Sequence, residues 1–213
     1  MEAVLARLGE LGIIPVVKIE QEQHALPLMK ALLEGGLPCA EITLRTEAGL
    51  GVIRRIAAEF PDVLVGAGTV LSVEQAEQAA AAGAQYIVSP GFDPDVVDWC
   101  LLQDVPVVPG AITPTEINMA LKKRLHILKF FPAQASGGAD MLKALADPYS
   151  GVKFIPTGGI TAENLPEYLR LGNVHACGGS WMVPAKLIAQ HEFGQIAKLT
   201  REAVALVQRH THA

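Results

Sequence analysis

A chain of 213 residues is long enough for one sizeable α/β domain or two small ones, and no charged or Ser/Gly-rich linker divides it, which favours a single domain over 1–213. Half of the residues are apolar and 5% are aromatic, with 20 glycines and 14 prolines, as is typical of an α/β protein with many short turns. The net charge of -5 comes without a basic block or an aromatic-studded basic stripe, so we expect no nucleic-acid partner.

Short apolar runs alternate with longer amphipathic runs along the chain. Eight strands are expected, at residues 13–19, 39–45, 63–70, 86–91, 106–112, 127–133, 153–160 and 174–182. Helical patterns lie between them, for example at residues 20–36, 72–84 and 161–172, and several of them end at a glycine. The strands recur about every 20 to 26 residues, which is a spacing that favours βαβ units.

Strands and helices that alternate in this way imply right-handed crossovers and a parallel sheet. Eight such units predict a (β/α)8 TIM barrel. An open doubly wound sheet is the main alternative, but its glycine-rich phosphate turn normally follows the first strand, and residues 13–21 contain no glycine. The active site of an eight-stranded barrel lies at the C-terminal ends of the strands, so polar residues there are the candidates.

The second expected strand carries three polar side chains on one face. Side chains alternate along a strand, so Glu41, Thr43 and Arg45 share a face, while the apolar residues between them share the other. Because the helices outside a barrel require the apolar face, we expect the polar face to line the lumen, with Arg45 nearest the mouth. A buried ion pair that only links strands is the structural alternative.

Lys129 lies inside an apolar run, where an ammonium ion is costly to bury. The same alternation places it on one face with Ile127 and Phe131, and a lumen that also holds Glu41 would give it a partner. Desolvation and a neighbouring cation such as Arg45 lower the pKa of a lysine in general, which yields the neutral amine that attacks a carbonyl carbon. We therefore expect Lys129 to form a Schiff base, the alternative being a lysine that snorkels or pairs structurally.

Glycine-rich turns follow three of the expected strands. Thr69 lies beside the glycines of the third strand. Loops after strands seven and eight commonly form the phosphate site of a barrel, because their backbone N–H groups are free to bind an anion. Glycine pairs there predict a phosphate site made by Gly158, Gly159, Gly179 and Ser180, although such pairs can also mark only tight turns.

The remaining chemistry-bearing residues are scattered. The three cysteines form no CxxC pair, and the six histidines form no HxxxH or carboxylate-spaced set at a strand end, so we expect neither a disulfide framework nor a metal site. No leader-like segment and no stretch of about 20 apolar residues occurs, so we expect a cytoplasmic protein without a membrane partner.

Six segments of the chain together resemble one enzyme family: "EITLRT" (41–46), "VGAGTV" (65–70), "SPG" (89–91), "LKFFPA" (128–133), "PTGGI" (156–160) and "GGSW" (178–181). In order and spacing they are similar to the 2-keto-3-deoxy-6-phosphogluconate (KDPG) aldolases, which are also known as 4-hydroxy-2-oxoglutarate (KHG) aldolases. The resemblance implies a class I aldolase on a (β/α)8 barrel, usually a homotrimer, without metal or other cofactor. One departure is Gln134, where the family often has glutamate.

The resemblance also implies roles for individual residues. Lys129 would be the Schiff-base lysine, and Glu41 the general acid/base at the carbinolamine and the pyruvate enamine. The other implied contacts are Arg45 and Thr69 at the pyruvate carboxylate, Pro90 and Phe131 along the pocket wall, and Thr157, Gly158, Gly159 and Ser180 at the polar tail and phosphate. Lys18 would add charge near the phosphate, or be an ordinary surface lysine.

The implied substrate is a phosphorylated 2-keto acid, KDPG, cleaved to pyruvate and glyceraldehyde 3-phosphate, with KHG as a second substrate. A phosphosugar isomerase or epimerase that uses Glu41 as a base without a covalent adduct is one alternative. A catalytically silent phospholigand-binding barrel is another, because the fold alone does not determine function.

Overall fold

The computed structural model describes residues 1–211, so the last two positions of the expected domain, 212 and 213, lie outside the described residues. The strands are β1 (Ile13–Val17), β2 (Cys39–Thr43), β3 (Leu64–Gly68), β4 (Ile87–Val88), β5 (Val107–Val108), β6 (Ile127–Phe130), β7 (Lys153–Pro156) and β8 (Cys177–Gly179). The helices are α1 (Glu2–Leu11), α2 (Ala25–Glu34), α3 (Gly49–Glu59), α4 (Val73–Ala81), α5 (Pro94–Leu102), α6 (Pro114–Lys122), α7 (Gly138–Ala146), α8 (Leu165–Leu169), α9 (Ala185–Ala189) and α10 (Phe193–Thr211), with short 3-10 turns at Glu22–His24 and Gln134–Ser136.

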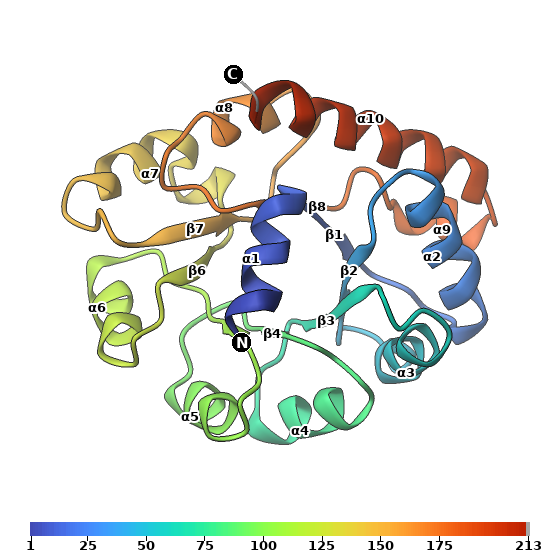
Figure 1. The fold of residues 1–213 in the computed structure, drawn as a ribbon, viewed down its shortest axis with the longest axis horizontal. Coiled ribbons are helices and arrows are strands. Elements are labelled where there is room, and N and C mark those ends of the chain that lie inside the picture. Colours follow the sequence, from blue (N-terminus) through green and yellow to red (C-terminus); the bar gives the residue numbers. More distant parts are fainter. Residues whose placement is uncertain (212–213) are drawn as a thin grey trace.

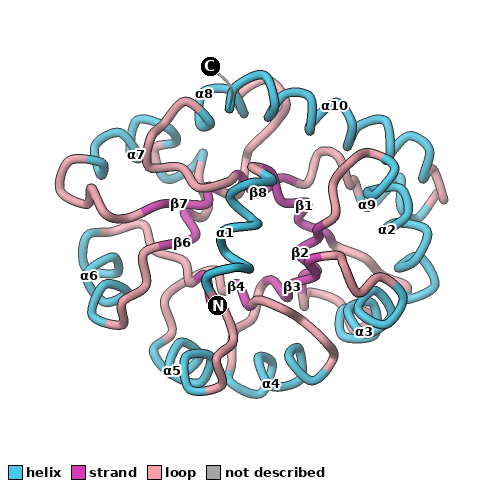
Figure 2. Tube along the Cα trace, in the orientation of Figure 1, coloured by secondary structure: helices cyan, strands magenta, loops and turns pink. Residues whose placement is uncertain are grey.

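The strands lie in the middle of the molecule and the helices surround them (Figures 1 and 2). All pairings between the strands are parallel, so the expected mixed α/β fold with a parallel sheet is confirmed. The hydrogen-bonded ladder forms a six-stranded sheet, in the order β5-β4-β3-β2-β1-β8, and a two-stranded sheet of β6 and β7.

The expectation of one continuous eight-stranded sheet is therefore only partly met. Isolated parallel bridges join the two sheets, from Gly110 to Lys129 on one side and from Thr157 to Gly178 on the other. The six-stranded sheet ends at β5, which Pro106 and Pro109 flank. Because proline has no N–H to donate, these positions leave only two residues of regular strand between them.

Each expected strand range contains the observed strand but extends past it, mostly at the C-terminal end. The range 39–45 ends as a strand at Thr43, and the range 127–133 ends at Phe130. Apolar residues follow the strand in both cases, Leu44 in the first and residues 131–133 in the second. The residues beyond these C-terminal strand ends instead form loops at the mouth of the ring.

Helix starts follow from local side-chain chemistry at several positions. Thr113 and Glu116 form a capping box at the start of α6, with Pro114 in the first turn. Asp93 caps α5 by accepting from the N–H of Asp95 and of Val96. These caps fix where the loop after each strand ends and the outer helix begins.

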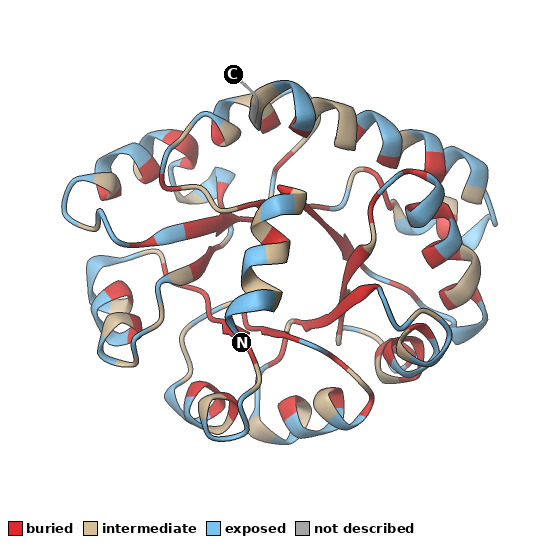
Figure 3. Ribbon diagram, in the orientation of Figure 1, coloured by how far each residue is buried: buried red, intermediate tan, exposed pale blue. Residues whose placement is uncertain are grey.

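Helix α1, which the sequence analysis did not predict, covers the N-terminal end of the strand ring (Figure 1). On its inner face Leu8 is buried and Val4, Leu5 and Leu11 are partly buried, whereas its outer face is exposed (Figure 3). Leu8 is fully buried beneath the ring, and the carbonyl oxygen of Leu5 lies 2.7 Å from Nε2 of His175. Gly12 ends the helix in the left-handed region, with a φ of 67°, and turns the chain directly into β1. The closed end of the lumen is thus built by the first eleven residues.

None of the helices within residues 1–211 is both long enough and apolar enough to cross a bilayer.

Leu8→Ala tests the contribution of α1 to stability. We expect it to lower the free energy of unfolding by about 2–5 kcal/mol, because it removes a fully buried side chain and leaves a cavity that rigid strands cannot fill. Leu102→Ala is the control, since Leu102 is 81% exposed and its loss should change stability by no more than about 0.5 kcal/mol. Urea unfolding measures both, and equal effects would contradict the role given to α1.

Candidate active site

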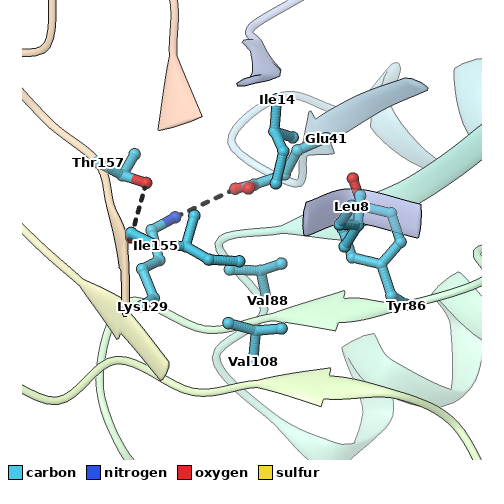
Figure 4. A pocket seen from close by; sticks show the side chains of 9 residues that line it. All are labelled: Leu8, Ile14, Glu41, Tyr86, Val88, Val108, Lys129, Ile155 and Thr157. Carbon is cyan, nitrogen blue, oxygen red and sulfur yellow. Dashed lines mark hydrogen bonds and ion pairs between the residues drawn. The ribbon is translucent and has the colours of Figure 1, made fainter. Parts of the chain in front are cut away.

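Lys129 and Glu41 meet inside the strand ring, on strands that are far apart in the sequence (Figure 4). Nζ of Lys129 donates to Oε1 of Glu41 over 3.1 Å, and only 6% and 3% of the two side chains are exposed. A pair this deeply buried is held by direct contact, because little water is present to screen either charge. The structure therefore places both residues in the lumen, as the strand alternation predicts.

The backbone fixes the two side chains from several directions. Glu41 lies in β2 opposite Val16 of β1 and Gly66 of β3. Lys129 lies in β6 opposite Ile155 of β7, and its N–H donates to the carbonyl oxygen of Pro109 over 2.9 Å. Both Cα atoms are thus set by strand pairing on two sides, which leaves only side-chain rotation to adjust the contact.

Two glycines make room for the polar side chains of the lumen. A Cβ on Gly68 would lie 2.2 Å from Oε1 of Glu41, and a Cβ on Gly178 would lie 2.3 Å from Oγ1 of Thr157. Both distances are far inside van der Waals contact, so any side chain there would displace the polar group. Gly68 of the "VGAGTV" segment is therefore required by Glu41 for steric reasons.

A small cavity of about 10 Å³ lies beside the Lys129–Glu41 pair. Its lining residues are Leu8, Ile14, Glu41, Tyr86, Val88, Val108, Lys129, Ile155 and Thr157. Thr157, one of the expected substrate contacts, is buried here beside Lys129 (Figure 4).

Tyr86 is a lumen residue that the sequence analysis did not select. Burial, followed by the nearby Cys39 thiol and the Glu41 carboxyl, raises the pKa of Tyr86 well above its usual value, so this phenol stays neutral. A signal was present in the sequence. Tyr86 has the same strand parity as Pro90, which was expected to face the pocket, and parity alone would have placed Tyr86 on the same side.

A larger pocket of about 370 Å³ opens at the mouth of the ring. Its lining residues are Val16, Lys18, Arg45, Ser180, Trp181, Val183, Pro184 and Ala185. Three expected substrate contacts, Lys18, Arg45 and Ser180, are therefore brought together from the loops after β1, β2 and β8. All three are exposed, and the pocket offers two cationic side chains and a hydroxyl.

Arg45 is hydrogen-bonded to Thr43, the last residue of the strand that precedes it. Its Nε donates to Oγ1 of Thr43 over 3.2 Å, and the same hydroxyl donates to the carbonyl oxygen of Val17 over 2.8 Å. Because β2 ends at Thr43, Arg45 leaves the lumen wall and reaches the mouth pocket. Lys18 is less constrained, since its Nζ contacts Glu20 at 2.7 Å on the surface.

Phe131 and the glycines after β7 form the wall beside the lysine. Nζ of Lys129 lies 5.3 Å from the centroid of the Phe131 ring. Gly158 and Gly159 have φ values of 95° and 80°, and a Cβ on Gly158 would lie 3.2 Å from the same ring. Gln134 accepts a hydrogen bond from the hydroxyl of Tyr168 over 2.6 Å.

The other expected contacts lie at strand ends outside the two pockets. Thr69, half-buried after β3, has a φ of 58°, an unusual value for a β-branched residue and a mark of local strain. Pro90 is half-buried, and a Cβ on Gly110 would lie 2.1 Å from the carbonyl oxygen of Pro90. Gly179 lies beneath the ring of Trp181, which a Cβ would approach to 2.0 Å. For Gly179, therefore, the structure shows a steric reason for glycine.

Within residues 1–211, no group of three or more histidine, cysteine, aspartate or glutamate side chains is arranged to hold a metal ion.

Comparison with known proteins gives a consistent match along the chain. The family model "KDPG and KHG aldolase" matches residues 4–199. The chain is 49% identical over 207 residues to the 2-dehydro-3-deoxy-phosphogluconate aldolase of Treponema pallidum, covering 97% of this chain and 99% of that protein. It is 43% identical over 192 residues to the KHG/KDPG aldolase of Escherichia coli K12, covering 90% of each.

A solved structure of KDPG aldolase from Legionella pneumophila, with pyruvate captured as a covalent carbinolamine, is similar over nearly the whole fold. The TM-score is 0.90 at 40% identity, covering 95% of this chain and 96% of the other.

The buried Lys129–Glu41 pair predicts a specific pattern of stabilities. Lys129→Met or Glu41→Gln alone should each lower the free energy of unfolding by about 3–5 kcal/mol, because each leaves one buried charge without its partner. The double variant should lose clearly less than the sum of the two. Urea unfolding of the three variants measures the coupling, and additive losses would contradict it. The surface pair of Lys143 and Asp140 is the control, and Lys143→Met should cost no more than about 1 kcal/mol.

Proposed function

The chain belongs to the KDPG and KHG aldolase family, and from that premise we propose the reaction that its lumen performs. The protein is a class I aldolase, a lyase of the Entner–Doudoroff pathway. It cleaves KDPG to pyruvate and glyceraldehyde 3-phosphate, and KHG to pyruvate and glyoxylate. The substrates are small 2-keto acids, and the nucleophile is Lys129.

The single observation that carries this proposal is the contact of 3.1 Å between the Lys129 amine and the Glu41 carboxylate in the lumen. An amine nucleophile next to a group that can accept or return protons is the arrangement that Schiff-base chemistry needs. The L. pneumophila aldolase holds pyruvate as a covalent carbinolamine, the first intermediate of such chemistry. That relative supports the assignment of Lys129.

The proposed reaction begins when Glu41 takes a proton from the Lys129 ammonium, and the neutral amine then attacks the C2 ketone and forms a carbinolamine. Glu41 supplies the proton that lets hydroxide leave as water, which gives the protonated imine. The base then takes the C4 hydroxyl proton, directly or through a water, as C3–C4 breaks and its electron pair moves into the imine. The aldehyde leaves. Protonation of the enamine at C3 and hydrolysis of the imine release pyruvate and restore Lys129.

The mouth pocket supports a site for the anionic groups of the substrate. We assign Arg45 and Thr69 to the pyruvate carboxylate, and Lys18 with Ser180 to the far end of the substrate. Thr157, Gly158, Gly159 and Gly179 complete the proposed phosphate and polar-tail contacts, while Pro90 and Phe131 wall the pocket. The positive charge of Lys18 and Arg45 in one pocket favours a phosphate or a carboxylate there.

We further propose that the two sheets act as one closed (β/α)8 barrel and that residues 1–213 form one domain. The bridges at Gly110 and Thr157 support closure, because each joins the edges of the two sheets. A homotrimer and a cytoplasmic location follow from the family resemblance and from the composition of the chain. Analytical ultracentrifugation tests the trimer, which a monomeric mass would exclude.

Lys129→Ala tests the nucleophile. We expect turnover of KDPG to fall by about 10³-fold or more, because no other amine can form the imine in the lumen. Mass spectrometry after borohydride treatment with pyruvate should show a stable adduct on the unmodified protein and none on the variant. Lys143→Ala removes an exposed lysine outside the lumen and should keep the adduct. An undiminished adduct on Lys129→Ala would refute the assignment.

Lys18→Met tests the mouth pocket. The Michaelis constant for KDPG should rise roughly ten-fold, the size of a lost hydrogen bond to a charged group, while kcat changes little. The rise should be smaller for KHG, whose distal carboxylate carries less charge than a phosphate. Lys30→Met, at an exposed position on α2, should leave both constants unchanged. Equal effects on both substrates would remove Lys18 from the phosphate site.

A further inference from the structure

The hydroxyl of Tyr86 is a buried polar group without a hydrogen-bond partner among the described residues. The whole side chain is inaccessible to solvent. A phenol hydroxyl normally finds a partner when it is buried, because an unpaired donor loses its hydration without compensation. Its position in the floor of the lumen therefore requires an explanation.

The ring of Tyr86 crosses β3 at a glycine, which leaves space for it. A Cβ on Gly66 would lie 2.3 Å from Cζ of the ring, so only glycine allows the crossing. Gly66 is paired in register with Glu41 on β2. The hydroxyl end of the ring therefore points toward the strand that carries Glu41.

The cavity between these side chains has the size of one water molecule. Its volume of about 10 Å³ corresponds to roughly one water-sized probe. Four polar side chains line it, those of Tyr86, Glu41, Lys129 and Thr157. A buried water needs two to four such partners, and the apolar side chains of Leu8 and Ile14 close the remaining sides (Figure 4).

We propose that a single water in this cavity joins the hydroxyl of Tyr86 to the carboxylate of Glu41, so that Tyr86 is a positioning residue for the catalytic acid/base. The phenol donates to the water, and the water donates to the carboxylate. A carboxylate accepts several hydrogen bonds at once, so the contact of Lys129 at Oε1 leaves capacity for this one. The water fixes the orientation of the carboxylate.

This inference rests on the role of Glu41 in the proposed function for its kinetic consequence. Lys129 and Tyr86 lie on opposite sides of the Glu41 carboxylate (Figure 4), and the pocket at the mouth is lined by other residues. Loss of the phenol oxygen should therefore change the proton-transfer steps and leave substrate binding intact. That separation distinguishes a positioning role from a general loss of structure.

The test is Tyr86→Phe, which removes one oxygen and keeps the ring. We expect kcat at neutral pH to fall roughly three- to ten-fold, the size of one lost neutral hydrogen bond. The pH profile of kcat should change, and the Michaelis constants should stay unchanged. The melting temperature should fall or stay the same. Tyr149→Phe is the matched control, because that hydroxyl bonds to Pro114 and Asn118 outside the lumen and its loss should leave the pH profile unchanged.

Two results would overturn the inference. One is a Tyr86→Phe variant with an unaltered pH profile and a higher melting temperature, as expected if the hydroxyl is simply unpaired. The other is a high-resolution crystal structure without a water within hydrogen-bonding distance of both the Tyr86 hydroxyl and the Glu41 carboxylate. Such a crystal structure of the unmodified protein also decides the matter if the Tyr86→Phe variant does not fold. Borohydride trapping of pyruvate on the unmodified protein tests the proposed function separately, so either idea can fail alone.

Discussion

The contact between Lys129 and Glu41 is the interaction on which the rest of the structure depends. Two charges removed from water are stable only when they face each other closely, so both strands must be held to within a fraction of an ångström. The parallel pairing on each side of Glu41 and the bridges around Lys129 supply that precision. The same burial makes the amine useful, because a lysine that is kept from bulk water and beside a proton acceptor can become a nucleophile.

The limited volume of the lumen is the second constraint. Glycines meet it, because they leave space for the larger side chains of neighbouring strands. Large side chains such as Tyr86 and Leu8 fill the floor, and glycines on neighbouring strands leave the space that Tyr86, Glu41 and Thr157 occupy. A lumen packed in this way leaves room for about one water beside the pair. Substrate must therefore approach from the open side, where the loops after the strands have placed the cationic groups.

The sequence was sufficient where the determining physics is local. Strand alternation depends only on neighbouring residues, and it placed Glu41 and Lys129 correctly inside the ring. The strand ends were predicted too far along the chain, because an apolar run looks the same in a strand and in a packed loop. Arg45 nevertheless lies at the mouth, as expected. Helix α1 was not predicted, although Leu5, Leu8 and Leu11 have helical spacing and Gly12 follows them as a helix stop signal. Its role depends on the closed end of the lumen, which exists only after the strands have assembled.

Helix α1 also fixes the direction in which the molecule can be attached to a support. It is joined to β1 by Gly12 alone, so Met1 lies at the closed end of the ring, and 44% of its surface is exposed. Parallel strands carry their two ends to opposite sides of the molecule, and the pocket with Lys18 and Arg45 opens on the far side. An affinity tag or a covalent tether at the first residue would therefore orient every immobilised copy with its entrance toward the solution.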